Sequence, residues 1–116
     1  MRRRHCDQDR IINFDVVDGV LVRQVTLPDG RTYTHRCTRQ VFEEVAHHVD
    51  EHASEGVTLD PLAEALDAPC TQVNVALEFL KDRGCVVTRG RRNYPASRGV
   101  FEDAMIEFCY LAEAPY

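Results

Sequence analysis

The sequence predicts a single α+β domain in which a three-stranded antiparallel meander precedes several helices and a short hairpin. Three observations lead to this prediction. Apolar and polar residues alternate over residues 11–36, as they do in strands that bury one face. From residue 38 the apolar spacing becomes that of helices. Two short β-like runs within residues 85–96 flank a cluster of arginines, which is typical of a hairpin.

The meander is predicted from its two turns. Asp18-Gly19 favours a two-residue hairpin turn, because both positions need a positive φ. Pro28-Asp29-Gly30 predicts the second turn, with glycine in the left-handed conformation. The resulting register places these pairs opposite each other: Val16 with Leu21, Ile12 with Val25, and Tyr33 with Val25.

The first helix is expected to begin after Thr38, a suitable N-cap, and to be closed by Gly56 as a C-terminal cap. The composition, 44% hydrophobic, is consistent with a folded chain. The first helix is expected to bury an apolar stripe. The stripe consists of Val41, Phe42, Val45, Ala46, Val49 and Ala53.

Two further helices and the hairpin follow. A short helix over residues 59–66 tolerates Pro61 in its first turn, and Asp67-Ala68-Pro69 interrupts it. The next helix is predicted over Cys70 to Arg83, with Gly84 as its stop. Strands over 85–88 and 93–96 would then flank the turn 89–92. Ser97 is the expected cap of a last helix, whose stripe is Phe101, Ala104, Met105, Phe108, Leu111 and Ala112.

The segment from Val57 to Ala96 resembles a winged helix-turn-helix. A short helix, a turn of about three residues, a second helix and a two-stranded wing follow one another in the order that this family uses. The residues that carry the resemblance are Leu62, Ala63, Leu66, Val73, Leu77, Leu80 and Gly84. On this basis the chain divides into a flexible basic arm (1–9) and one winged-helix domain (10–116). That domain comprises the N-terminal meander (10–37), the helix-turn-helix with its wing (38–97) and an amphipathic C-terminal helix (98–116).

The resemblance implies a transcriptional regulator that binds double-stranded DNA by occupancy, without catalysis. The helix over residues 70–83 would enter a major groove with its N-terminal residues at base edges. Gln72 and Asn74 are suited to pair with adenine, and Val75 to touch a thymine methyl group. Lys81 and the wing arginines would contact phosphates. The expected DNA-binding residues are Thr71, Gln72, Asn74, Val75, Lys81, Arg89, Arg91 and Arg92.

Charge gives a mixed indication for this partner. The net charge of −5 opposes binding to nucleic acid, and Glu78 on the presumed reading helix would repel phosphate. The charge is nevertheless segregated along the chain. Residues 41–68 hold eight carboxylates and no Lys or Arg, whereas residues 81–98 hold six basic residues and one acid. A binding surface depends more on the local field than on the total charge.

Two protein-binding alternatives remain open. The chain could be a winged-helix module that binds a protein, with Val75 and Phe79 as outward apolar anchors. The last helix also shows Ile106 and Tyr110 on its far side, so it is apolar over most of its circumference and is expected to be buried on two sides. Either a second copy of the chain, forming a homodimer, or the N-terminal meander could cover that second side.

The remaining motifs indicate little chemistry. His35, Cys37 and Ser97 have no motif joining them, so we expect no enzyme. Glu44, His48 and His52 have metal-ligand spacing, and Glu51 and His47 lie nearby. A solvated helix face is the more common explanation, so neither a metal nor a cofactor is expected, and a small-molecule or metal sensor that uses this face is the third and least favoured hypothesis. The five scattered cysteines favour free thiols, and the absence of an apolar leader or span favours a cytoplasmic protein without membrane contact.

Overall fold

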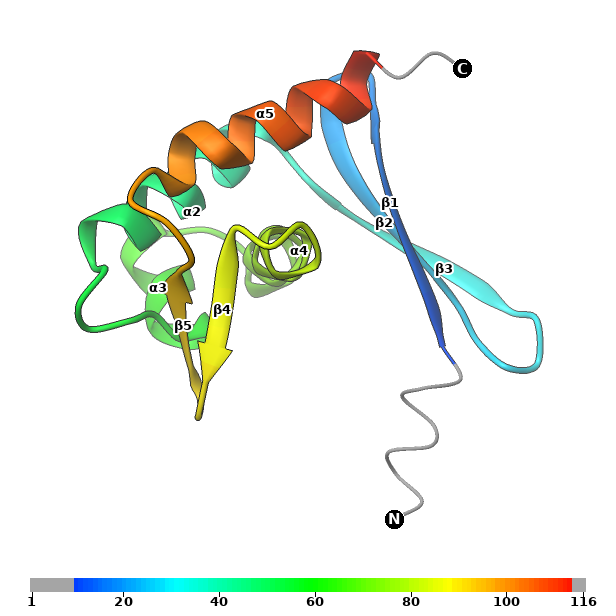
Figure 1. Ribbon diagram of the computed structural model, residues 1–116. Coiled ribbons are helices and arrows are strands. Elements are labelled where there is room, and N and C mark those ends of the chain that lie inside the picture. The colour runs from blue at the N-terminus through cyan, green and yellow to red at the C-terminus, as the bar shows by residue number, and fades with distance from the viewer. Residues whose placement is uncertain (1–9, 114–116) are drawn as a thin grey trace.

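The computed structural model describes residues 10–113 as an α+β arrangement of two sheets and four helices (Figure 1). The predicted basic arm, residues 1–9, lies outside the described residues, as do residues 114–116. Within the described part of the chain, no helix combines the length and the apolar character needed to cross a bilayer.

The N-terminal meander is confirmed, strand by strand and pair by pair. It consists of β1 (Ile11–Val17), β2 (Val20–Thr26) and β3 (Thr32–Cys37), with β2 in the centre. Asp18 and Gly19 adopt φ values of 54° and 78°, so the first turn has the two positive angles that its sequence predicts. The three predicted pairs lie opposite each other: Val16 with Leu21, Ile12 with Val25, and Val25 with Tyr33.

Helix α2 (Arg39–Glu51) begins as expected, because the Thr38 side chain accepts a hydrogen bond of 3.2 Å from the backbone N–H of Val41. Its predicted end was wrong. His52 caps the helix, and Gly56 ends a further turn instead, with a φ of +76°. The chain must leave the helix early because the residue after Gly56, Val57, pairs with Asn93 of the C-terminal hairpin.

Helices α3 (Leu59–Leu66) and α4 (Cys70–Asp82) follow, and the hairpin comprises β4 (Val86–Arg89) and β5 (Arg92–Pro95). Asp67 ends α3 in the left-handed conformation, with φ 52°. The hairpin turn is tighter than predicted and contains only Gly90 and Arg91. Gly90 has φ +62°, the positive angle that the first central residue of a type II′ turn requires.

Helix α5 (Val100–Glu113) starts without the predicted cap. The Ser97 hydroxyl donates to the Asp103 carboxylate and accepts from the N–H of Gly99 before the helix, but it accepts nothing from the first turn. The capping group is the carboxylate of Asp50 in α2. Its two oxygens each accept a 2.9 Å hydrogen bond, one from the N–H of Val100 and one from that of Phe101. Asp50 therefore ties the two helices together and satisfies donors that a helix start leaves free.

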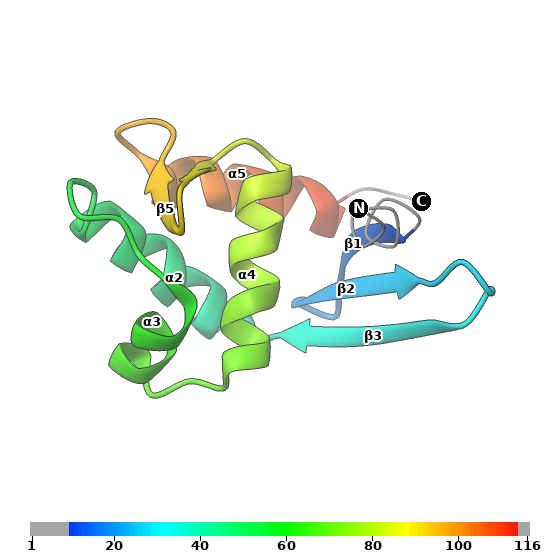
Figure 2. The same ribbon diagram turned by 90° about the horizontal axis from the view of Figure 1, so that it is seen from below.

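A column of phenylalanine rings joins the sheet to the helices. Phe79 of α4 lies edge-on to Phe14 of β1 and to Phe42 of α2, with ring centroids 5.3 and 5.6 Å apart. Phe42 stacks in turn on Phe108 of α5 at 5.1 Å. Helix α4 is thus packed on two sides, against the other helices and against the meander. Seen from below, it lies between strands β2 and β3 on one side and the hairpin on the other (Figure 2).

Candidate functional site

The open face of α4 is a narrow polar stripe. Thr71, Lys81 and Asp82 are exposed, and Asn74 and Glu78 are half-buried. These positions recur at intervals of three or four residues, so they share one side of the helix. The hairpin lies on one side of α4 and the meander on the other (Figures 1 and 2).

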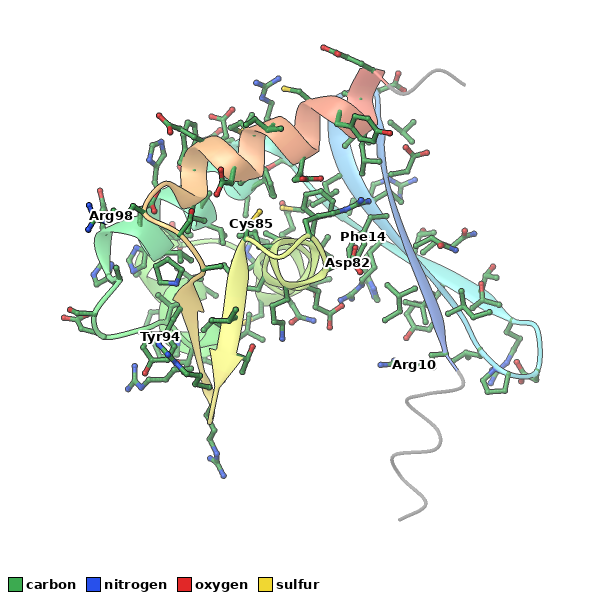
Figure 3. The ribbon with its side chains drawn as sticks, viewed as in Figure 1. Arg10, Phe14, Asp82, Cys85, Tyr94 and Arg98 are labelled. Atoms are coloured by element: carbon green, nitrogen blue, oxygen red, sulfur yellow. The ribbon has the colours of Figure 1, made fainter. Side chains whose placement is uncertain are left out.

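Two of the residues expected to face outward were placed wrongly by the sequence prediction. Val75 and Phe79 are fully buried. The reason is the meander, which packs directly on this side of α4 through β3 and β2. At the C-terminal end of α4, Asp82 lies near Phe14 of β1, and both residues line the same shallow surface pocket (Figure 3). Val75 is therefore not available to a thymine methyl group, and neither residue is available as an anchor for a protein.

The side chains of Gln72 and Asn74 differ in their hydrogen bonding within the molecule. The side-chain oxygen of Gln72 accepts a 3.0 Å hydrogen bond from the backbone N–H of Thr38, the cap of α2. Gln72 thus has a structural partner within the molecule. Asn74 is half-buried on the open stripe, and Thr71, one turn before it, is exposed. These two residues form the polar end of the stripe.

The predicted wing carries its arginines on the surface. Arg89, Arg91 and Arg92 are all exposed. The guanidinium of Arg89 lies 4.5 Å from the ring centroid of Tyr94, whose position on the hairpin is labelled in Figure 3. Arg92 donates to the backbone carbonyl oxygens of Glu55 and Gly56 at 3.3 and 3.5 Å. Arg91 occupies the turn itself, and no ion pair holds it among the described residues.

A buried arginine that the sequence analysis missed changes the electrostatics of the stripe. Arg23 lies on the inward face of β2, and one guanidinium nitrogen is 2.6 Å from a carboxylate oxygen of Glu78. A second nitrogen lies 2.8 Å from Nδ1 of His35. Because a guanidinium can only donate, Nδ1 of His35 accepts and its neutral ring carries the proton on Nε2. The repulsive charge expected at Glu78 is therefore offset within the molecule. The sequence did indicate that Arg23 faces inward, because it alternates along the strand in step with the apolar Leu21 and Val25.

A second group of polar residues gathers at the end of α2. His48, Glu51 and His52 each offer a ligand atom within 4.8 Å of the others. The two imidazole rings are stacked, with centroids 4.0 Å apart. Burial, together with the neighbouring His52, lowers the pKa of His48. Glu44 and His47, which the sequence placed near this group, lie elsewhere: Glu44 accepts from Gln40, and His47 stacks on Phe101.

Comparisons with protein-family models, curated proteins and solved structures find no match for this chain. The geometry therefore carries the functional argument. Among the described residues it offers two candidate sites: the stripe of α4 with the basic hairpin, and the histidine group at the end of α2.

Proposed function

We propose that this chain is a winged-helix regulator that binds double-stranded DNA and acts by occupancy, without a catalytic step. The observation that carries the proposal is the position of the arginine-bearing hairpin directly beside an open polar stripe of α4. The order of α2, α3, α4 and the hairpin agrees with the helix-turn-helix and wing that the sequence resembles. In such domains the second helix reads bases while neighbouring groups hold phosphates.

Each part of the stripe has a role in this proposal. Thr71 and Asn74, at the N-terminal end of α4, would approach base edges, and an asparagine amide can pair bidentately with adenine. Lys81 would contact a phosphate at the other end of the stripe. Gln72 contributes less than its sequence position suggests, because its oxygen is engaged by Thr38.

The hairpin gathers positive charge in a chain whose net charge is −5. Arg91 at its turn and Arg89 beside it project from the surface, so phosphate can approach them without displacing an acidic partner. The ion pair between Glu78 and Arg23 removes one source of repulsion from the stripe. The local field near the hairpin, rather than the net charge of −5, then determines the approach of DNA.

The test is a titration of DNA binding against salt. Arg91→Ala should weaken binding almost equally on all sequences and should lower the salt-dependence slope by about one unit, since one phosphate contact is lost. Asn74→Ala should instead cost roughly 1–3 kcal/mol on a preferred site and little on random DNA. Arg31→Ala is the matched control, because Arg31 also lies beside a hairpin turn but pairs with Asp29.

Two results would contradict the proposal. One is the absence of salt-sensitive DNA binding by the unmodified protein even near about 50 mM salt. The other is an equal loss of binding in Arg31→Ala and Arg91→Ala, which would reflect net charge rather than a contact at the hairpin.

The second candidate is a protein-binding role, now through α5 instead of α4. Ile106 and Tyr110 lie one helical turn apart and are 65% and 66% exposed, so the meander does not cover them. Large apolar side chains this exposed on one helix face favour contact with a second copy of the chain. A homodimer through α5 is compatible with DNA binding, because Ile106 and Tyr110 belong to a different helix from the stripe, and α5 packs against α2 and β1 (Figure 1).

A further inference from the structure

The end of helix α2 gathers three metal-ligating side chains at one point. His48, Glu51 and His52 occupy positions i, i+3 and i+4, so one helix face brings them together, and their ligand atoms lie within 4.8 Å of one another. Two imidazoles and a carboxylate form a donor set that zinc and similar ions bind, whereas magnesium and calcium prefer oxygen ligands. We propose that these three residues bind one divalent transition-metal ion of the zinc class.

The hydrogen bond of His52 supports this assignment independently of proximity. Nδ1 of His52 lies 3.0 Å from the backbone carbonyl oxygen of His48. A carbonyl can only accept, so the neutral ring is protonated at Nδ1 and keeps the lone pair of Nε2 free. A histidine that binds a metal usually donates its other ring N–H to a carbonyl or carboxylate in this way. The ring of His52 therefore has Nε2 free for a metal, and one of the two stacked rings must rotate for both to bind the same ion.

The electric field at this point favours a cation. The group lies at the C-terminal end of α2, where the helix dipole is negative. Glu51 contributes a carboxylate, and Glu55 lines the same pocket as His48 and His52. Arg92, which lines the same pocket and donates to the carbonyl oxygens of Glu55 and Gly56, opposes a cation, so the carboxylates must outweigh its charge.

The surroundings leave room for further ligands. His48 and His52 line a pocket of about 230 Å³ whose other walls include the turn at Gly56 and Arg92 of β5. Three protein ligands leave at least one position of a tetrahedral ion for water or a small anion. An ion held here would lie between the end of α2 and the hairpin, although the binding proposal does not depend on what the hairpin does.

The experiment uses the full chain, freed of metal with a chelator, and Zn²⁺ alone in isothermal titration calorimetry. We expect one ion per chain. Glu51→Gln and His48→Gln should each weaken binding by roughly tenfold or more, since each removes a direct ligand. His47→Gln is the matched control, because His47 neighbours the group on the same helix but stacks on Phe101. Circular dichroism checks that each variant is folded, and the exposed Glu51 is the change that disturbs packing least.

Cysteine binding is the competing explanation, and Co²⁺ distinguishes it. A cobalt complex with these three residues should lack the intense thiolate charge-transfer absorption that cysteine ligands produce, and alkylation of the thiols should leave binding intact. The proposal is overturned if Zn²⁺ does not bind, if His47→Gln weakens binding as much as Glu51→Gln, or if alkylation abolishes binding. None of these measurements involves DNA, so their failure is independent of DNA binding.

Discussion

At the scale of single residues, close packing between the hairpin and the rest of the chain depends on Gly56. This residue is buried, has a positive φ and lies against the hairpin. A Cβ at this position would come within 2.8 Å of the Tyr94 ring and 3.1 Å of Cβ of Arg92. Both the backbone angle and the close approach therefore require glycine.

Gly56→Ala should be much more destabilising than Gly90→Ala. Both positions have a positive φ, so each change should cost about 1–2 kcal/mol in backbone strain. Only Gly56 has neighbours within 4 Å of the added carbon, and overpacking should cost it roughly 1–3 kcal/mol more. Urea denaturation of the two variants measures the difference. Equal losses of stability in the two variants would show that the hairpin does not pack closely against Gly56.

The buried thiol of Cys37 gives a prediction about pH and reactivity. Burial raises the pKa of Cys37 to about 12, from an ordinary value of 9.0. The folded state therefore holds the thiol proton more tightly than the unfolded chain does. The protonated thiol of Cys37 contributes to stability fully below a pH of about 9, and this contribution is lost as the pH rises from about 9 to about 12. At pH near 8, a thiol reagent should modify the exposed Cys70 and leave Cys37 untouched until urea unfolds the chain. Peptide mass spectrometry reads each site, and similar rates in the folded protein would contradict the burial of Cys37.

At the scale of whole elements, local signals were read correctly and distant ones were not. The turn at Asp18-Gly19, the cap at Thr38 and the stop at Gly84 act within a few residues, and the structure has all three. Apolar spacing identified α4, but that helix is apolar on two sides. Spacing alone could not indicate that the second side meets a sheet formed more than 30 residues earlier. Val75 and Phe79 were misplaced for this reason.

The start of α5 shows the same limitation. Serine before a helix is a sound local signal for a cap, yet Asp50, 50 residues earlier, provides the carboxylate. The histidine group at the end of α2 was only partly predictable. Helical spacing brought His48 and His52 together, but the choice of Glu51 over Glu44 depends on side-chain conformations that spacing does not determine.

Asp50→Ala tests the cap of α5. The change leaves two N–H groups at the start of α5 without their acceptor, so it should destabilise the fold by about 0.5–2 kcal/mol. Ser97→Ala, at the position that the sequence favoured, should stay within about 0.5 kcal/mol, because Ser97 and its hydrogen bonds to Asp103 and Gly99 are exposed to solvent. Thermal or urea unfolding of both variants compares them directly. A larger loss of stability in Ser97→Ala than in Asp50→Ala would show that Asp50 is not the cap of α5.

For the molecule as a whole, the meander serves as a second covering layer for α4. It buries Val75 and Phe79 of that helix, while Thr71, Lys81 and Asp82 remain exposed. Helix α5, which carries the exposed Ile106 and Tyr110, packs against α2 and β1 (Figure 1). The proposed DNA contact on α4 and the proposed self-association contact on α5 therefore involve different helices.

Tyr110→Glu tests self-association through α5. If Ile106 and Tyr110 meet a second copy, the new carboxylate would be buried without a partner and should yield folded monomers. Tyr33→Glu is the control, since Tyr33 is also exposed but lies on the meander. Sedimentation velocity gives the oligomeric state of each variant. A monomeric unmodified protein at high concentration would exclude the dimer.

The pairing of Val57 with Asn93 has a consequence for local opening of the fold. Each residue's N–H donates to the other's carbonyl oxygen, at 2.9 and 2.8 Å, although Val57 belongs to no helix or strand. The Asn93 side chain adds a third bond to the same carbonyl of Val57. Breaking this pair would detach the hairpin and the turn after α2 together, so the two segments should open as one cooperative unit. The amide protons of Val57 and Asn93 should accordingly exchange with solvent at matching slow rates, and the binding of Zn²⁺ beside them should slow both equally.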